Sequence, residues 1–252
     1  MLSLIPIPGI PLVERGDSVP DLVVEAARLA GIVFASGDVL VIAQKIISKA
    51  EGRVVSLRAV LPSETAQQLA LETEKDPRLI ELILQESREI VRARKGVIVV
   101  EDRRGFVCAN AGIDRSNVQQ QGGGDQVALL PLDPDASAQT IREVLHNRTG
   151  ATVAVIVNDS HGRAFREGTV GVAIGIAGLP ATVDRQGDRD LTGYTLQHTV
   201  IGLADEIAAA ASLLMGPAAE GIPAVLVRGL QLPAAEGSAS DLQRPRHTDL
   251  FR

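Results

Sequence analysis

Apolar runs that each end in polar residues constrain the fold of this chain more than any other feature. Four such runs are strand-like, DVLVIAQKI (38–46), GVIVVED (96–102), ATVAVIVND (151–159) and IPAVLVRGL (222–230). The third is typical of a strand that is buried on both faces. Because aromatic residues make up 2% of the 252 residues, the core must be built from Val, Ile, Leu and Ala.

Helical patterns lie between these runs. We expect a helical stretch over 63–93 that is capped by Ser63, with a second helix starting inside it at Asp76-Pro77. We also expect an Asp/Ser-capped helix within 129–150 that stops at Gly150. An Ala-rich helix should run from about Thr199 to Met215. Residues 119–126 read as a flexible polar loop. The regularly placed glycines of 170–183 indicate close backbone packing and do not fit a plain doubly wound sheet. The pattern alone supports an α/β or α+β architecture, with no repeat or linker that divides the chain.

Composition excludes several classes of protein. A net charge of -6 argues against general nucleic-acid binding. The first residues lack the basic segment of a signal peptide, and the Ala-rich helix carries Asp205 and Glu206, so we expect a soluble, cytoplasmic protein with no membrane span. The lone Cys108 excludes an intramolecular disulfide, and its apolar flanks predict a buried, inert thiol.

Three polar clusters follow apolar runs, although the usual nucleotide-binding signatures are missing. The clusters are QKIISK with Lys45 and Lys49, GIDRSN with Asp114 and Asn117, and NDSHGRAFR with Asp159 and Ser160. Two carboxylates at strand exits are hard oxygen ligands suited to Mg²⁺ or Mn²⁺, and lysines beside them suit phosphate. Two other readings stay open, since the lysines fit a solvated strand end and the aspartates fit helix or turn caps. We discount His161 as a zinc ligand because no second His lies at ligand spacing.

A resemblance to a known family rests on these clusters and on other motifs in the same order. PGIPLVERGDS, VIAQKIISKAEGR, ETEKDPRLIELIL, GFVCANAGIDRSNV, LLPLDPDASA, NDSHGRAFREGTVGVAIG and LVRGL together resemble the coenzyme F420-0:L-glutamate ligases, the F420 gamma-glutamyl ligase family. The resemblance covers nearly the whole chain. It implies a single α+β domain, in one or two lobes, with mixed sheets and packed helices that forms a homodimer, and no fused nitroreductase-like domain.

The resemblance also implies an activity. Such a ligase would use GTP to phosphorylate the terminal carboxylate of F420-0, and the amine of L-glutamate would then displace phosphate to form an amide. A second round would act on F420-1. The resemblance implies two divalent ions, Mn²⁺ or Mg²⁺, and allows for K⁺. Two alternatives stay open, a related ligase with another carboxylate acceptor and a non-catalytic GTP-binding relative.

Site residues are carried over by position. The resemblance implies ligation of a first metal by Asp114 and Asp159 and of a second metal by Ser160. It also implies contacts to GTP from Ile10, Pro11, Leu12, Val13, Gln44, Lys45, Lys49, Asn117, Met215, Gly216, Pro217, Ala218, Ala219, Glu220, Gly221 and Ile222. Lys49, Arg163 and Arg166 are candidate catalytic cations, the two arginines by our own inference. Pro217 stands where the family pattern has a metal-contacting glutamine, so a backbone carbonyl or water would have to replace that amide.

Overall fold

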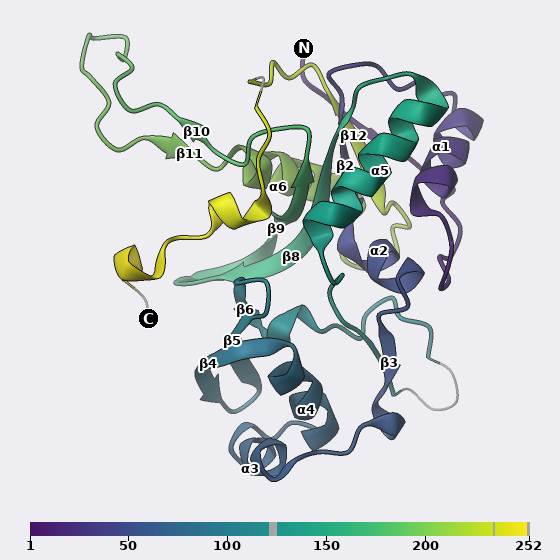
Figure 1. Cartoon of the computed structure of the whole chain (residues 1–252), viewed down its shortest axis with the longest axis vertical. Helices are drawn as coiled ribbons and strands as arrows, with labels where there is room; N and C mark the ends of the chain where they lie inside the picture. Colours follow the sequence, from purple (N-terminus) through teal and green to yellow (C-terminus); the bar gives the residue numbers. More distant parts are fainter. Residues whose placement is uncertain (121–124, 234, 251–252) are drawn as a thin grey trace.

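A five-stranded mixed sheet forms the centre of the protein (Figure 1). The computed structural model describes residues 1–120, 125–233 and 235–250. The strands lie in the order β1 (Ser3–Pro6), β12 (Ala224–Arg228), β2 (Val39–Ala43), β8 (Ala154–Arg163) and β9 (Arg166–Ala177). β2 and β8 are parallel, and the other neighbouring pairs are antiparallel. The fold is therefore α+β with mixed sheets, as the resemblance implies.

Helices cover both faces of this sheet. One face packs against α1 (Val19–Leu29), α2 (Gln44–Ala50) and α5 (Pro134–Thr149), and the other packs against α6 (Leu203–Met215). Leu40 and Ile42 of β2 point into the first layer, whereas Val39 and Val41 point into the second, and all four are fully buried. Burial on both faces explains why this run lacks polar alternation.

A smaller lobe lies below this layered body in Figure 1. It consists of α3 (Glu64–Thr73), α4 (Pro77–Gln85) and a sheet of β4 (Ser87–Arg94), β5 (Val97–Asp102) and β6 (Val107–Ala109). The lobe has its own hydrophobic cluster, in which Leu57, Ile80, Ile83 and Ile98 are buried. β3 (Val54–Ser56) pairs with β7 (Gln126–Ala128) where the chain enters and leaves the lobe.

The remaining elements are short. β10 (Val183–Asp184) and β11 (Val200–Ile201) pair with each other at the base of a projecting arm. Short 3₁₀ helices lie at Leu57–Ala59, Asn110–Gly112, Ala239–Leu242 and Arg246–Thr248.

The predicted starts of α3, α4 and α5 are confirmed. Ser63 accepts a hydrogen bond from the Ala66 amide, and Asp76 caps α4 ahead of Pro77. Asp133 caps α5, which ends at Gly150 in a left-handed conformation. Cys108 is buried, as predicted, and burial raises the pKa of its thiol to about 12, so the thiol stays protonated at neutral pH.

Four predicted boundaries are wrong. The strand at 151–159 continues to Arg163, so Asp159 and Ser160 lie within β8 and do not follow it. The strand at 38–46 ends at Ala43, and the two lysines lie on helix α2. The helical stretch at 63–93 ends at Gln85, because 87–94 alternate half-buried and exposed side chains and pair with β5 as a strand. The Ala-rich helix begins at Leu203, since Val200–Ile201 pairs with β10. Part of the predicted loop at 119–126 lies outside the described residues, and Gln126 begins β7.

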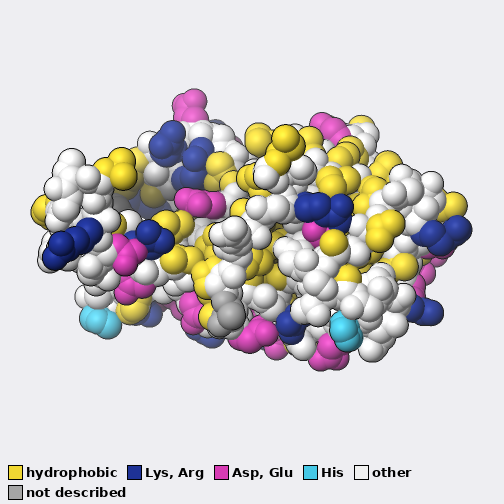
Figure 2. Space-filling view, turned by 90° about the horizontal axis from the view of Figure 1, so that it is seen from above, with side chains coloured by type: hydrophobic (Ala, Val, Ile, Leu, Met, Phe, Trp, Pro, Cys, Tyr) yellow, Lys and Arg dark blue, Asp and Glu magenta, His cyan; other side chains and the backbone are white. Residues whose placement is uncertain are grey.

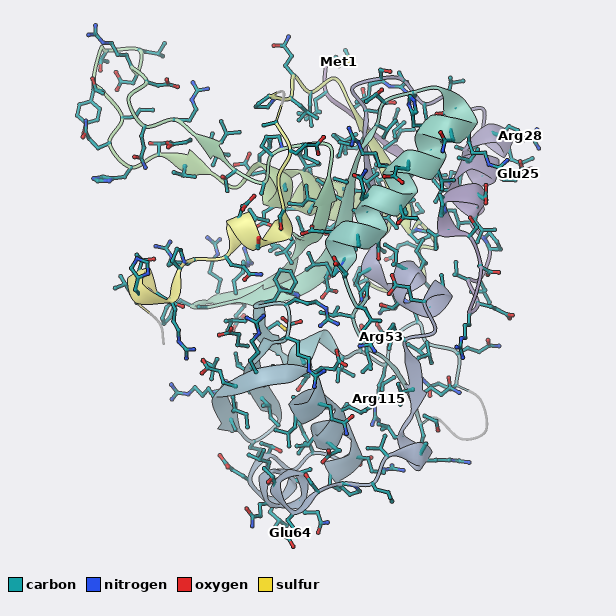
Figure 3. All side chains as sticks on the ribbon, viewed as in Figure 1. Met1, Glu25, Arg28, Arg53, Glu64 and Arg115 are labelled. Carbon is teal, nitrogen blue, oxygen red and sulfur yellow. The ribbon has the colours of Figure 1, made fainter. Side chains whose placement is uncertain are left out.

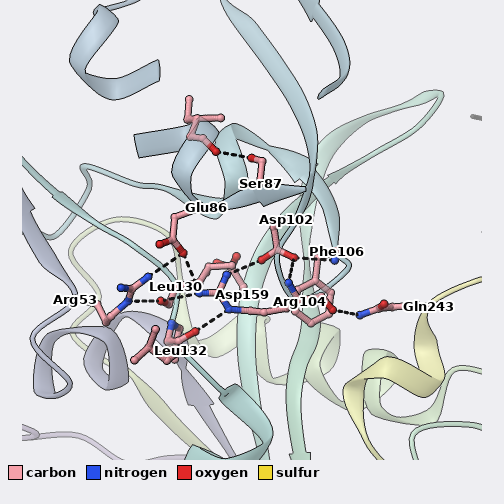
Figure 4. A network of polar contacts seen from close by, with 12 residues as sticks. Arg53, Glu86, Ser87, Asp102, Arg104, Phe106, Leu130, Leu132, Asp159 and Gln243 are labelled. Atoms are coloured by element: carbon pink, nitrogen blue, oxygen red, sulfur yellow. Dashed lines mark hydrogen bonds and ion pairs between the residues drawn. The ribbon is translucent and has the colours of Figure 1, made fainter. Parts of the chain in front are cut away.

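A network of buried charges joins the two lobes (Figure 4). Asp102 is fully buried and forms an ion pair with Arg104 at 2.7 Å, while Glu86 pairs with both Arg104 and Arg53. The guanidinium of Arg104 also donates to the carbonyls of Leu130 and Pro131. Arg53 lies where the lobes meet, far from Glu64 at the tip of the small lobe (Figure 3). Because each buried charge has partners, the network specifies how the lobes join.

The glycines of β9 pack closely, as predicted. An alanine side chain at Gly171 would meet the Ala208 carbonyl oxygen and Asn158 Oδ1, each at 2.6 Å, and one at Gly175 would meet the backbone of Pro134. These glycines therefore allow α6 and α5 to approach the sheet.

Gly171→Ala should lower the free energy of unfolding by about 1–3 kcal/mol, because α6 must move away from β9. Urea denaturation measures this difference. Gly162→Ala in β8 is the matched control, since nothing lies within 4 Å of its new methyl group. Equal stability of the two variants would contradict the close approach of α6.

Candidate nucleotide and metal site

A cavity of about 650 Å³ opens where β2 ends, beside Asn158, Asp159 and Ser160 in the middle of β8. The parallel register places Ala43, the last residue of β2, beside Asn158, so the start of α2 and residues 158–160 of β8 lie at the same end of the parallel pair. Ligands bind at this end in many open sheets with parallel strands. The cavity is completed by the 10–13 segment, by the loop that carries Asp114, and by the turn after α6.

Most residues predicted for the site line this cavity. Among the described residues these are Ile10, Pro11, Leu12, Val13, Gln44, Lys45, Lys49, Asp114, Asn117, Asp159, Ser160, Met215, Gly216, Pro217, Ala218, Ala219, Gly221 and Ile222. The segments come from distant parts of the sequence, and the fold brings them together. Their roles toward GTP and metal stay predictions.

Lys45 and Asp114 form the central ion pair of the site. Lys45 Nζ lies 2.7 Å from Asp114 Oδ2 and 2.7 Å from Ser116 Oγ. The Asp114 backbone is held by two hydrogen bonds to Ala128 of β7, so its position does not depend on its side chain. Burial alone would raise the pKa of Asp114, but hydrogen bonds from Lys45 and Ser116 hold the pKa below its usual value. The carboxylate is therefore ionised at neutral pH.

Lys49 lies one turn of α2 beyond Lys45 and lines the same cavity. Burial and the nearby charge of Lys45 both lower the pKa of Lys49. Two ammonium groups on one helix face are destabilised by each other, and an anionic ligand between them would relieve that repulsion. The positions of Lys45 and Lys49 therefore agree better with the predicted contacts to phosphate than with a solvated helix face.

Asp159 follows an irregularity in the pairing of β8 with β9. The register shifts between Val157 and Asn158, and such bulges redirect the side chains that follow. Asp159 Oδ2 lies 2.9 Å from Nε2 of His161. Burial lowers the pKa of His161, but Asp159 and the more distant Asp102 and Asp205 outweigh it and the pKa is raised.

Two predicted residues shape the loops around the cavity. Asn117 is in the left-handed conformation and its Nδ2 donates to the Ala218 carbonyl at 2.9 Å, which joins the GIDRSN loop to the turn after α6. Glu220 accepts from the Ala218 amide within that turn and does not line the cavity. Gln44 is buried and accepts from Ser48 Oγ, so its side chain supports α2 from within.

Arg163 and Arg166 lie outside the cavity. They face each other at the tip of the β8–β9 hairpin, and Arg163 donates to the backbone carbonyl of Glu167. Their guanidinium groups are exposed. Neither arginine lines the cavity, and their roles as catalytic cations that bind phosphate or a substrate carboxylate stay predictions.

Sequence reasoning missed several cavity residues. Ser116 and Asn158 lie inside clusters that were singled out, so their neighbours could have indicated them. Thr169 and Gly171 of β9 lie inside the motif NDSHGRAFREGTVGVAIG but were not assigned to the site, and no motif marks Ser212 and Leu213 of α6. The contact between His161 and Asp159 was also missed, since a zinc pattern was the one role considered for His161. Arg115 of GIDRSN lies outside the cavity and contributes, after burial, to lowering the pKa of Lys75.

The donor set fits a hard divalent cation held partly by its ligand. Among the described residues no three His, Cys, Asp or Glu side chains gather as a complete metal site. Mg²⁺ is usually bound through one or two carboxylates together with phosphates and water, which matches Asp114 and Asp159 with the hydroxyl of Ser160. The Lys45 ammonium already places a positive charge against Asp114 Oδ2.

One face of the molecule carries charged side chains of both signs. On the face shown in Figure 2, basic side chains lie interspersed with acidic ones over the described residues. Within the same residues no helix combines the length and apolar character that crossing a membrane requires.

Comparison with known proteins decides the family. The model of the F420-0:Gamma-glutamyl ligase family matches residues 9–229. The chain belongs to this family. A coenzyme F420:L-glutamate ligase of Methanothermobacter thermautotrophicus is 50% identical over 100% of this chain and 99% of its own length. Proteins of the same name from Methanopyrus kandleri and Methanocaldococcus jannaschii are 46% and 45% identical, covering 100% and 89% of this chain and 98% and 88% of their own lengths. The family resemblance seen in the sequence is confirmed.

Lys45→Met should raise the pKa of Asp114, because the hydrogen bond that offsets burial is removed. Titration of the Asp114 carboxyl carbon by NMR measures this change. Lys95→Met, which removes an exposed ion pair with Glu74, is the control and should leave that pKa unchanged. An unaltered Asp114 pKa in Lys45→Met would contradict the ion pair at the centre of the site.

Proposed function

We propose that this protein is a GTP-dependent ligase that joins L-glutamate to coenzyme F420-0 through an amide bond, in one or more rounds. Family membership and the names of the relatives support the acceptor and the amino acid. The observation that carries the proposal is the cavity in which two lysines and two aspartates converge at one sheet edge. An anionic nucleotide and an anionic acceptor can share a site when cations and metal-binding oxygens line it.

The proposed reaction has two steps. A carboxylate oxygen of the acceptor attacks the γ-phosphorus of GTP, and GDP leaves to give an acyl phosphate. The amine of L-glutamate then attacks the acyl carbon, phosphate leaves, and the nitrogen loses a proton. Phosphorylation is needed because oxide is a poor leaving group.

The chain's own residues would bind and orient these anions. Lys45 and Lys49 would neutralise phosphate oxygens as point charges, since they approach the cavity from one face of α2. Asp114 and Asp159 would hold one divalent cation, Mg²⁺ or Mn²⁺, and Ser160 would contribute to a second; when bound, these ions would balance phosphate charge. Pro217 in the cavity wall offers its backbone carbonyl but no side-chain ligand for a second ion.

Mass spectrometry of the reaction with F420-0, L-glutamate, GTP and Mn²⁺ tests the proposal. Products should carry one or more added glutamyl units, and their formation should require GTP. Bound GTP without any glutamyl product would contradict the proposal and favour another acceptor or a non-catalytic relative. Homodimerisation, which the resemblance implies, is tested on the same sample by light scattering.

Asp114→Asn should reduce glutamyl transfer to below about 1% of wild type, because a neutral amide is a weaker ligand for the cation. The fold should persist, since the Asp114 backbone is held independently by Ala128. Circular dichroism and the initial rate measure the two effects. Wild-type rates in this variant would contradict the assignment of Asp114 as a metal ligand.

Lys49→Ala should raise the KM for GTP by about 10-fold or more, which is the cost of losing a charge-assisted contact to phosphate. The KM for L-glutamate should change little. Lys95→Ala in the small lobe is the control for loss of one positive charge. An unchanged KM for GTP would contradict the contact and would support the interpretation of Lys49 as a solvated residue of α2.

A further inference from the structure

We propose that His161 is a positioning residue, which fixes the Asp159 carboxylate for a divalent cation without contacting the reacting groups. The proposal rests on the proposed function, because that function makes Asp159 a metal ligand. Neither the family pattern nor the clustering of oxygen donors assigned a role to this histidine.

The contact itself is short and sheltered. Nε2 of His161 lies 2.9 Å from Asp159 Oδ2, and the two side chains are 14% and 15% exposed. The imidazole N–H donates to one carboxylate oxygen and so restricts rotation of the Asp159 side chain. Among the described residues, the other oxygen of that carboxylate accepts no hydrogen bond, so it remains available as a ligand.

The imidazole is held in turn by the small lobe. The ring of Phe106 meets His161 edge-on, with centroids 6.5 Å apart and planes at 73°. The Phe106 amide donates to Asp102 Oδ1 at 2.9 Å, and the fully buried Asp102 is paired with Arg104 (Figure 4). A chain of packed and hydrogen-bonded groups therefore runs from the lobe junction to the predicted metal ligand.

This arrangement corresponds to the outer contacts that orient metal ligands in many proteins. Such contacts set the orientation of a ligand and typically change metal affinity by about 10- to 100-fold when removed. A direct ligand role for His161 is less consistent with the structure, since the nitrogen nearest the site already donates to Asp159. If His161 acted only through packing, the volume of its side chain would matter and its N–H donor would not.

Binding of Mn²⁺ alone, measured from the electron paramagnetic resonance signal of the free ion, separates these roles in the full chain. His161→Leu and His161→Met remove the donor but keep apolar bulk, and both should weaken Mn²⁺ binding about 10-fold or more. His161→Gln, whose amide N–H can donate in place of Nε2, should stay within about 3-fold of wild type. Thermal unfolding of each variant reports whether the fold persists.

Two outcomes overturn the inference. Wild-type affinity in the apolar variants would show that no positioning is needed. Equal weakening in all three variants, or loss of the fold in both apolar ones, would assign His161 to packing at the lobe junction. Asp159→Asn tests the underlying proposal separately, because unchanged Mn²⁺ binding in that variant would remove Asp159 from the metal site whatever His161 does.

Discussion

The parallel pairing of β2 with β8 is the constraint on which the site depends. It brings the end of β2 beside Asn158 within β8, so that α2 with its lysines starts next to Asn158 and Asp159. An antiparallel arrangement of the same two strands would place these residues at opposite ends. The strand cores are buried on both faces, so a slip in register would expose apolar side chains. The position of the cavity therefore follows from hydrophobic burial.

Charge balance within the cavity is the second organising feature. Lys45 compensates Asp114, while Lys49 remains beside it with a lowered pKa and Asp159 is oriented by His161. The cavity thus presents ammonium groups for an anion and carboxylates for a cation. The phosphoryl transfer proposed above would use both kinds of group. The buried network of Arg104, Asp102 and Glu86 stabilises the lobe junction from which Phe106 supports the imidazole.

Much of this arrangement was predictable from sequence, for identifiable reasons. The strands before Lys45, Asp159 and Arg228 were found because wholly apolar runs mark them, and the caps at Ser63 and Asp76 follow from local hydrogen bonding. β4 was mistaken for helix because its period-two alternation directly follows a helical pattern. The position of Arg163 and Arg166 at the tip of the β8–β9 hairpin was not predictable, because the length of the hairpin depends on the register of the two strands, which a motif does not encode. The His161–Asp159 contact likewise depends on the bulge at Asn158.

The central claim is that Asp114 of the GIDRSN loop and Asp159 of β8 share one cation beside the lysines of α2. A crystal structure with Mn²⁺ and a non-hydrolysable GTP analogue tests it most directly, through the anomalous signal of manganese. The account predicts a peak within ligand distance of a carboxylate oxygen from each aspartate, with phosphate oxygens facing Lys45 and Lys49. A manganese peak away from both aspartates, or nucleotide bound outside this cavity, would contradict it.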